Sequence, residues 1–442
     1  METNPKNKKI GTKMSALLAF MTLCTPSVLA VDAYAPAINA GDTAWVLAAA
    51  ALVLLMTPGL ALFYAGMVRK KNVVAMTIQC FTVIALISVQ WVLFGYSLAF
   101  GPDKGGLIGG LEWVGLKGVG GTPNADYAAT IPHTVYMMFQ AMFAIITPAL
   151  ILGAFADRIK FSTLIVFILL WSTIVYDPVA HWVWGAGGWI RNMGALDFAG
   201  GTVVHITAGI SALAAALVIG RRKDFGHNMK PHNVPMIILG AGMLWFGWFG
   251  FNAGSALAAN DVAANAFLAT NTAAAAAGLA WMLISWVHMG KPNAVGIVTG
   301  SVVGLVAITP ASGYVGPIES IIIGAVASLV SYTAMYLKNK YTRVDDSLDV
   351  FACHGLGGTV GALATGLFAS KLINPAGANG LFFGNPAQLV TQSVAVAATF
   401  VYAFVMTLIL FKVLDMTMGL RVTDEEEIVG LDIASHGEEA YT

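Results

Sequence analysis

The chain has 442 residues, of which 57% are hydrophobic and only 10% are charged. A soluble domain carries about a quarter charged residues, so this composition excludes an ordinary water-soluble fold and predicts an all-α protein that spans a membrane. The 23 basic and 23 acidic residues balance, which leaves no basic field for nucleic acid. The three cysteines are too few for a disulfide framework or a cysteine metal cluster, and we expect neither a metal nor a cofactor.

The first 30 residues have the features of a secretory signal peptide. Four lysines lie between positions 6 and 13, an apolar stretch covers residues 14–29, and small residues end at Ala30. A signal peptidase removes such a segment; the alternative is an additional membrane helix. Under either interpretation Asp42 lies on the outer side, because the basic start of the chain stays inside.

Eleven later segments are apolar enough to cross a membrane. A crossing helix needs about 20 apolar residues for a hydrocarbon core of ~30 Å. The eleven segments are 43–68, 73–100, 131–155, 161–179, 197–220, 234–254, 262–289, 293–309, 316–338, 350–370 and 387–416. This number, with the N-terminus outside, places the C-terminus inside. The predicted domains are a cleavable signal peptide (1–30), a transmembrane domain (31–420) and a cytoplasmic tail (421–442).

Charge placement supports this topology. Fifteen basic residues fall in or beside the predicted inner segments, and only four, Lys104, Lys117, Arg191 and Lys371, fall in the outer ones. The inner segments of a multi-pass protein carry such an excess of Lys and Arg. We therefore predict a multi-pass membrane protein with the N-terminus out and the C-terminus in.

Two predicted spans contain related sequences, which indicates an internal repeat. One reads Asp197-Phe-Ala-Gly-Gly-Thr-Val-Val-His205, and the other reads Asp349-Val-Phe-Ala-Cys-His354-Gly-Leu-Gly-Gly-Thr-Val. These spans are fifth in successive sets of five, and a second copy of an odd-numbered unit enters the membrane from the opposite face. The result is a 5+5 inverted repeat of the kind found in transporters. Half one covers about 43–220, half two covers about 234–370, and the eleventh helix, about 387–416, lies outside the repeat.

His205 and His354 are predicted to meet near the middle of the membrane. At 1.5 Å per residue, His205 lies ~12 Å beyond Asp197 and His354 lies ~8 Å beyond Asp349. His354 is the shallower of the two, so Asp349 must itself lie inside the protein. Neutral imidazoles donate with one nitrogen and accept with the other, so a pair forms a polar path without fixed charge. The alternatives are packing histidines and the two axial ligands of a haem. We expect the other six histidines at the surface.

Acidic and aromatic residues surround these spans. Asp197 and Asp349 are predicted to cap the helix starts, where a carboxylate accepts free backbone N–H groups. Aromatic residues gather near the span ends, and such residues form an interfacial belt or bind a cation on their faces. They are Phe139, Phe143, Trp182, Trp184, Trp189, Trp245, Phe246, Trp248, Phe249 and Phe251. Together with the hydroxyl of Ser255, such faces would hold a small cation without a carboxylate to trap it.

Several long motifs resemble the ammonium transporter (Amt/Mep/Rh) superfamily, and its bacterial Amt branch in particular. The resemblance runs from about Asp42 to the C-terminus. The motifs are Gly194-Ala-Leu-Asp197 with its continuation to His205, Trp248-Phe-Gly-Phe251-Asn-Ala-Gly-Ser255, Thr309-Pro-Ala-Ser-Gly-Tyr314, Asp345-Asp346-Ser-Leu-Asp349 with its continuation to His354, and Gly430-Leu-Asp-Ile-Ala-Ser-His436 with its continuation to Tyr441.

The resemblance implies a homotrimer with one ammonium pathway in each subunit, and no enzymatic activity. It assigns an outer recruitment site to Phe143, Trp184 and Ser255, and a gate to Phe143 and Phe251. It assigns a twin-His pore to His205 and His354, structural support to Asp197, and the pore wall to Trp248 and Thr309. In a bacterial inner (plasma) membrane, ammonium would lose a proton at the gate and cross as ammonia. The twin histidines would either stabilise ammonia or relay the proton separately. The alternatives are an ammonium sensor with little flux and an Rh-type gas channel.

The resemblance also implies regulation from inside by a PII-type signal protein. The basic loop 221–230 and the tail 421–442 are the expected contacts, and the acidic run 424–427 is expected to be a solvated helix start. One departure from the family pattern concerns Arg191, which lies in a stretch between Trp184 and Asp197 that is one residue longer. This insertion falls at the outer mouth of the expected pathway.

Overall fold

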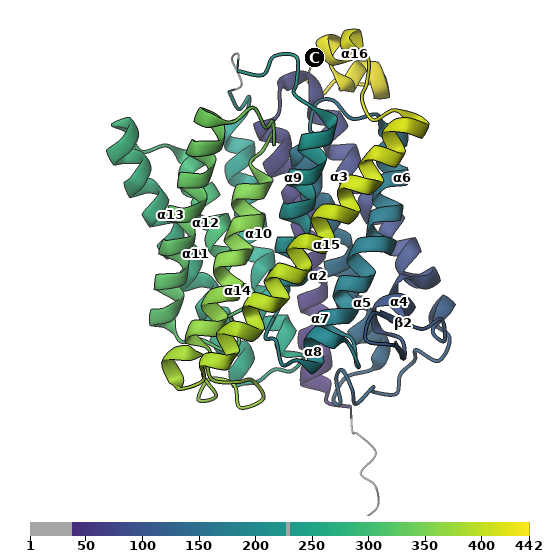
Figure 1. Ribbon diagram of the computed structural model, residues 1–442, viewed down its shortest axis with the longest axis vertical. Coiled ribbons are helices and arrows are strands. Elements are labelled where there is room, and N and C mark those ends of the chain that lie inside the picture. The colour runs from purple at the N-terminus through teal and green to yellow at the C-terminus, as the bar shows by residue number, and fades with distance from the viewer. Residues whose placement is uncertain (1–37, 227–229, 442) are drawn as a thin grey trace, which may run out of the picture. The chain divides into compact units, whose positions relative to one another are not determined.

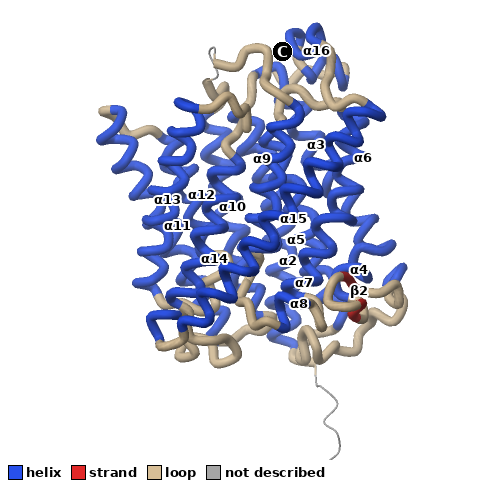
Figure 2. The backbone as a smooth tube through the Cα atoms, in the orientation of Figure 1, coloured by secondary structure: helices blue, strands red, loops and turns tan. Residues whose placement is uncertain are grey.

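The computed structural model describes residues 38–226 and 230–441, and the predicted signal peptide (1–30) lies outside the described residues. The described chain is mostly helical, with loops gathered at the two ends of the bundle, as Figure 1 and Figure 2 show. The first half contains α2 (Ala40–Met67), α3 (Val73–Gln90), α4 (Tyr96–Phe100), α5 (His133–Ile151), α6 (Phe161–Trp171), α7 (Asp177–Trp184), α8 (Trp189–Asn192) and α9 (Thr207–Ile219). A short antiparallel hairpin joins β1 (Asp103–Lys104) to β2 (Ile108–Gly109).

The second half begins at α10 (Val234–Ala253) and ends in a short helical tail. It continues through α11 (Asp261–Met289), α12 (Ala294–Ile308), α13 (Pro317–Tyr341), α14 (Gly357–Phe368), α15 (Pro386–Met418) and α16 (Asp424–Val429). We call the end of the bundle that carries α16 the tail face, and the opposite end, which carries the β1–β2 hairpin, the loop face (Figure 1).

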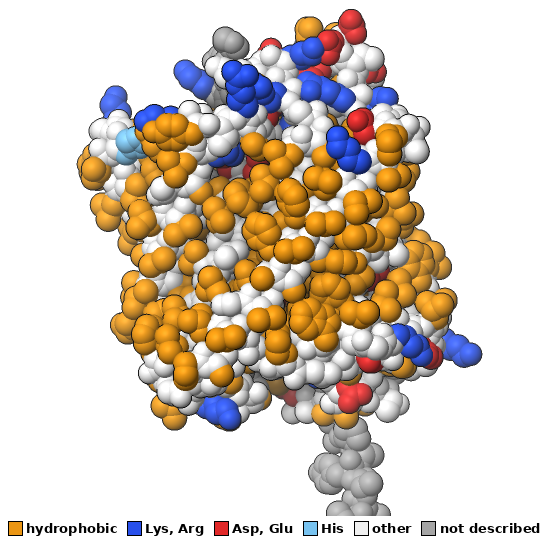
Figure 3. Space-filling view, viewed as in Figure 1, with side chains coloured by type: hydrophobic (Ala, Val, Ile, Leu, Met, Phe, Trp, Pro, Cys, Tyr) orange, Lys and Arg blue, Asp and Glu red, His pale blue; other side chains and the backbone are white. Residues whose placement is uncertain are grey.

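Ten described helices are long and apolar enough to cross a membrane. They correspond to ten of the eleven predicted segments. The remaining segment, 293–309, forms α12, which has only 15 residues and is therefore about 22 Å long, short of a ~30 Å core. An apolar band covers the side of the bundle between two polar ends (Figure 3). The chain is therefore a multi-pass membrane protein, and the count of eleven crossing helices stays a prediction.

The predicted end of the fourth span at residue 179 is wrong. The helix runs without interruption from Phe161 to Trp184, because α6 passes through a π-helical segment, Ser172–Tyr176, into α7. Residues 185–188 are not helical and separate it from α8. Pro178 lies just after the π-helical segment, because its ring and missing N–H are incompatible with regular hydrogen bonding inside a continuous α-helix. The longer helix carries Trp182 and Trp184 on its final turn, instead of in a following loop.

Glycine allows the two halves to approach closely beside the histidines. A Cβ added to Gly209 of α9 would overlap the backbone nitrogen of Gly355, the residue that follows His354. Small residues permit such close contact between membrane helices. The contact fixes the second-half histidine segment against the helix that follows His205.

The C-terminal tail packs along the tail face. The backbone N–H of Lys160 donates to the Leu420 carbonyl at 2.9 Å, and the Asp432 carboxylate accepts the N–H of Ala75 at 2.8 Å. The prediction of a wholly solvated acidic run is wrong for Glu427. Its side chain is buried and accepts from the Arg421 guanidinium at 2.5 Å, so the run starts a helix that is anchored to the bundle.

Candidate functional site

The two predicted histidines are in contact inside the bundle. His205 and His354 are both buried, and their Nδ1 atoms lie 3.2 Å apart. A contact between two like nitrogens requires one to donate and the other to accept, so one Nδ1 carries a proton and the other presents a lone pair. In the neutral pair, one Nε2 is then an acceptor and the other is a donor. The pair is polarised along its length without carrying a net charge.

Both histidines lie in six-residue π-helical segments, which are rare and frequently mark functional sites. These segments are Gly201–Ile206 and Phe351–Leu356. Each histidine also lies five residues after a residue with positive φ, which is Gly200 (φ 111°) in the first half and Asp349 (φ 57°) in the second. The two segments therefore share a local geometry that the spacing between histidine and acid in the motifs does not show.

Asp197 caps its helix as predicted. Its two carboxylate oxygens accept the backbone N–H groups of the four residues 200–203 at 2.6–3.1 Å. A helix start leaves such donors without intrahelical partners. The carboxylate is therefore fully occupied by the backbone, which agrees with a supporting position rather than with a cation ligand.

The predicted cap at Asp349 is wrong. The carboxylate that caps the second histidine segment belongs to Asp346, whose Oδ2 accepts the N–H of Phe351 at 2.8 Å. Asp349 instead forms an ion pair with Lys338, with 2.7 Å between Oδ1 and Nζ. Asp346 lies eight residues before His354, as Asp197 does before His205. This shared spacing explains why His354 looks too shallow when it is counted from Asp349.

The histidines line a narrow neck in the bundle. The neck encloses about 10 Å³, and its lining consists of His205, His354, Met56, Leu60, Phe63, Ile146, Leu150, Val204, Leu244, Trp248, Phe251 and Val302. A cavity of this size holds about one water-sized molecule. A haem held between the two imidazoles is excluded by this geometry, because the rings bond directly to each other and the neck has no room for a macrocycle.

A wider vestibule opens from the neck toward the loop face. It encloses about 580 Å³, and Phe143, Trp184 and Ser255 all line it. Phe143 lies between the two spaces, with its ring centroid 5.8 Å from that of Trp184 in the vestibule and 4.4 Å from that of Phe251 in the neck. The Phe143–Phe251 pair therefore separates the vestibule from the neck, at the position predicted for the gate.

Hydrogen bonds fix the vestibule side chains. The Trp184 indole donates to the Asp197 carbonyl at 2.9 Å, and the Ser255 hydroxyl donates to the Phe251 carbonyl at 2.9 Å. The Ser255 oxygen keeps its acceptor capacity, so the vestibule offers a hydroxyl acceptor beside aromatic faces, which attract cations. This is the set of groups that the sequence predicted for a cation site without a carboxylate ligand.

Other predicted aromatic residues lie elsewhere. Trp182 donates to the Leu107 carbonyl at 2.7 Å and packs against Trp189, so this pair holds the hairpin loop. Phe246 is 57% exposed on the bundle surface, as expected of the apolar belt, and Phe249 stacks on Phe267. These residues are outside the pathway.

Trp248 lines the neck, but Thr309 lies behind it. The Trp248 indole stacks on His205 with 5.3 Å between ring centroids and donates to the Thr309 hydroxyl at 2.9 Å. Thr309 is fully buried and is not among the neck-lining residues. Trp248 therefore lines the neck and Thr309 orients its ring, while their assignment to a pore wall stays a prediction.

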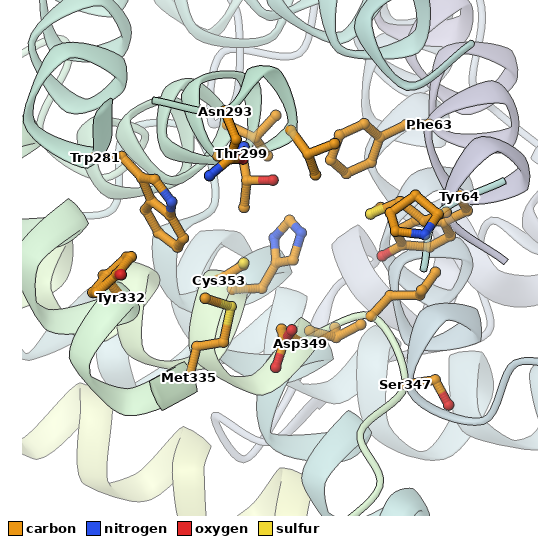
Figure 4. A pocket seen from close by; sticks show the side chains of 18 of the residues that line it. Phe63, Tyr64, Trp281, Asn293, Thr299, Tyr332, Met335, Ser347, Asp349 and Cys353 are labelled. Carbon is orange, nitrogen blue, oxygen red and sulfur yellow. Dashed lines mark hydrogen bonds between the residues drawn. The ribbon is translucent and has the colours of Figure 1, made fainter. Parts of the chain in front are cut away.

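A third space adjoins the neck on its tail-face side, and Figure 4 shows the side chains that line it. This tail-side cavity encloses about 280 Å³ and shares Phe63, Val302 and His354 with the neck. Asp349, Cys353, Tyr64, Trp281 and Tyr332 also line it. Sequence reasoning missed this cavity, because its lining comes from helices far apart in the chain and no motif joins them. The vestibule, the Phe143–Phe251 pair, the neck and the tail-side cavity follow one another through the bundle.

A buried ion cluster supports the tail face beside this cavity. Arg222 Nη2 lies 2.8 Å from Asp345 Oδ1, and Arg158 contacts the same carboxylate. Burial alone would raise the pKa of the Asp345 carboxyl, but the hydrogen bonds from Arg222 and the charge of Arg158 outweigh burial and hold its pKa below the usual value. The carboxylate therefore stays charged and ties the loop before His354 to the end of α9.

The surface prediction is also wrong for two further histidines. His133 is buried and bonds to the Tyr96 hydroxyl at 2.6 Å. His181 is buried between the Ala99 carbonyl at 3.0 Å and the Asp103 carboxylate at 2.9 Å. Their partners lie 37 or more residues away in the chain, so no local pattern marks them.

A multi-pass bundle with wide spaces near both ends and a narrow apolar neck between them defines a membrane transport protein. Residues 44–441 match the family model described as Ammonium Transporter Family. The chain is 53% identical to an ammonium transporter of Bacillus subtilis over 401 residues, covering 91% of this chain and 98% of that one. It is 51% identical to the ammonium transporter Amt1 of Archaeoglobus fulgidus, covering 91% and 99%.

Solved structures agree with these sequence matches. The crystal structure of Candida albicans Mep2 aligns with a TM-score of 0.84 at 37% identity, covering 91% of both chains. The chain belongs to the ammonium transporter family. Members of this family are transporters and not enzymes.

Proposed function

We propose that the chain recruits ammonium in the vestibule, removes a proton at the gate and conducts ammonia through the neck. The observation that carries this proposal is the direct contact between His205 and His354 in an otherwise apolar neck. A bare cation in such a neck would lose its hydration at a cost of many kcal/mol. Neutral ammonia avoids most of this cost and both donates and accepts hydrogen bonds, as the histidine pair does.

Recruitment is assigned to Phe143, Trp184 and Ser255. The two aromatic faces attract the ammonium charge, and the Ser255 oxygen accepts one of its N–H groups. The absence of a free carboxylate among these three side chains keeps ammonium from being held too strongly to move on. Asp197 supports this site by fixing the Trp184 ring through its backbone carbonyl.

Deprotonation is assigned to the Phe143–Phe251 gate. Ammonium splits there into ammonia and a proton, and ammonia alone enters the neck. The hydrogen-bonded imidazoles give the proton a route of its own, because each ring can accept at one nitrogen and release at the other. Potassium has a similar size but no proton to release, so the same path rejects it.

The topology belongs to the same proposal. We assign the loop face to the outside and the tail face to the cytoplasm of a bacterial inner membrane, with α12 as the additional crossing helix in a 5+5 inverted repeat. The basic residues predicted for the inner loops favour this orientation. The domain boundaries remain a signal peptide (1–30), the transmembrane domain (31–420) and a cytoplasmic tail (421–442).

Assembly and regulation extend the proposal. We assign the chain to a homotrimer with one path in each subunit, inhibited by a PII-type protein on the tail face. The basic loop and the tail form one surface there, since Lys223 pairs with Asp424 and its backbone N–H donates to Glu427 at 2.7 Å. A partner that docks on this surface would contact both segments at once.

Flux through the purified protein tests the central proposal. Proteoliposomes with and without the protein receive an ammonium gradient, and ammonium entry, current and internal pH are recorded together. We expect protein-dependent ammonium entry and no protein-dependent entry of potassium under a matched gradient. Potassium entry at a comparable rate would contradict the deprotonation scheme. Ammonium binding without entry would instead support a sensor.

A further inference from the structure

The vestibule contains a fixed positive charge beside the proposed cation site. Three charged residues line it, namely Asp126, Arg191 and Asp197. The Asp197 carboxylate is occupied by four backbone N–H groups at the helix start, so it offers little free charge. A cation-recruiting space that also holds an arginine needs a physical explanation.

Arg191 is held in place by neutral partners. Its Nη1 donates to the Trp184 carbonyl and its Nη2 donates to the Asp126 carbonyl, each at 2.9 Å. Its guanidinium carbon lies 5.8 Å from the centre of the Tyr127 ring. Within residues 38–226 and 230–441, no ion pair joins Arg191 to a carboxylate. Its positive charge therefore acts on the vestibule without being cancelled by a bonded acid.

We propose that Arg191 is a specificity-determining residue that excludes divalent cations from the vestibule while it admits monovalent ammonium. This inference rests on the proposed function of the vestibule as the ammonium recruitment site. Coulomb repulsion grows in proportion to the charge of the approaching ion. The penalty in free energy for Mg²⁺ is therefore twice that for ammonium, and the effect on the binding constant is squared.

The acidic lining explains why such exclusion is needed. Without Arg191, the charged residues that line the vestibule would be Asp126 and Asp197. The Asp197 oxygens are taken by backbone N–H groups, so the exposed Asp126 side chain would offer the carboxylate oxygens that Mg²⁺ and Ca²⁺ prefer. A divalent ion seated there would occupy the space in front of Trp184. Arg191 also bonds to the backbone of Trp184 itself, so its charge acts next to the ring that attracts ammonium.

The size of the effect follows from the distance. A unit charge on the order of 10 Å away in a water-filled vestibule changes the affinity of a monovalent cation by about two- to fourfold. The same charge changes the affinity of a divalent cation by about four- to sixteenfold. Arg191→Gln is therefore expected to lower the apparent KM for ammonium slightly and to create strong inhibition by Mg²⁺.

Ammonium currents in proteoliposomes test this inference, with Mg²⁺ added on the loop-face side at constant ionic strength. Arg191→Gln is compared with Arg191→Lys, which keeps the charge but loses the planar fork that bridges two carbonyls. We expect Arg191→Lys to resist Mg²⁺ as the wild type does, and Arg191→Gln to be inhibited at a roughly four- to sixteenfold lower Mg²⁺ concentration. Equal Mg²⁺ inhibition of the wild type and Arg191→Gln would overturn the inference, and so would Lys and Gln variants that behave alike.

A second experiment varies the charge at position 191 within a single folded variant, so that a folding defect cannot explain differences in Mg²⁺ inhibition. Arg191→Cys is modified with methanethiosulfonates of similar size that carry a positive, zero or negative charge. The native Cys80 and Cys353 are buried, and the protein without the Arg191→Cys substitution, treated with the same reagents, controls for their labelling. Mg²⁺ inhibition should strengthen from the positive to the neutral to the negative group, and inhibition that ignores this order would overturn the inference. Wild-type protein without protein-dependent ammonium entry would instead refute the proposed function itself.

Discussion

The two histidine segments reach the same geometry by different chemistry. In each half, a residue with positive φ precedes the histidine by five positions, and the histidine lies in a π-helical segment. The first half fills the positive-φ position with Gly200 and satisfies four backbone donors through Asp197. The second half places Asp349 there, caps with Asp346 and holds Asp349 by the Lys338 ion pair.

The comparison shows which features both histidine segments share and which are specific to one half. Both halves must present an imidazole at mid-depth at a fixed distance from the helix start. Glycine adopts positive φ without strain, whereas aspartate tolerates it at a cost that the Lys338 contact offsets. The first segment is therefore held mainly by backbone hydrogen bonds and the second mainly by charge, so the two should respond differently to mutation and to pH.

The largest expected effect is the loss of the Asp197 cap. Asp197→Ala leaves four buried N–H groups without their acceptor, and each such donor costs about 1–3 kcal/mol. We expect destabilisation of roughly 4 kcal/mol or more, a large fraction of the total stability of about 5–15 kcal/mol that is typical of a folded protein. Asp346→Ala removes one such acceptor and should cost only about 1–3 kcal/mol. Thermal unfolding of both variants in detergent measures the difference; equal losses would show that the two caps are equivalent.

The next effect concerns the ion cluster that anchors the second half. Asp345→Asn removes the countercharge that the buried Arg158 and Arg222 share and leaves Arg222 with only Asp157, 3.6 Å away; breaking such a buried pair costs about 3–5 kcal/mol. Because the folded-state pKa of Asp345 is lowered, its stabilisation is complete above the ordinary aspartate pKa of about 4 and is lost as the pH falls through the lower folded value.

The free energy of unfolding, measured as a function of pH, tests the direction in which the Asp345 contribution to stability changes. The stability difference between wild type and Asp345→Asn should be constant from neutral pH down to about pH 4 and should shrink below that. A difference that shrinks on raising the pH from neutral would contradict the assigned charge of Asp345.

The smallest effect tests the positive-φ positions. Gly200→Ala introduces a Cβ 2.7 Å from a Val204 methyl and forces alanine into positive φ, which costs about 1–2 kcal/mol. Asp349→Asn keeps a residue type that tolerates this backbone conformation and loses only the charge contact with Lys338. We expect Gly200→Ala to lower both stability and ammonium flux, and Asp349→Asn to cost less stability. The reverse order would mean that the charge contact, not the backbone, fixes the pair.

The sequence predicts the elements that depend on local patterns. The lengths of the apolar segments predicted ten helices that the structure contains, and the two similar motifs identified His205 and His354 as a pair. The motifs also paired Asp349 with Asp197, although Asp346 is the residue with the matching spacing and cap. That mistake arises because a cap is decided by where the backbone turns, and the turn at Asp349 is set by Lys338 on another helix. The tail-side cavity and the buried His181 depend on contacts distant in sequence, which no local pattern encodes.

The account depends on an uncharged histidine pair that passes ammonia through a neck closed to bare cations. Current and internal pH in proteoliposomes under an ammonium gradient, recorded for the wild type, His205→Ala and His354→Ala with matched protein amounts, test it most directly. We predict that each alanine variant loses at least about tenfold in ammonium flux, which corresponds to about 1.4 kcal/mol at the barrier, or loses its selectivity against potassium. Unchanged flux and unchanged selectivity in both variants would contradict the account.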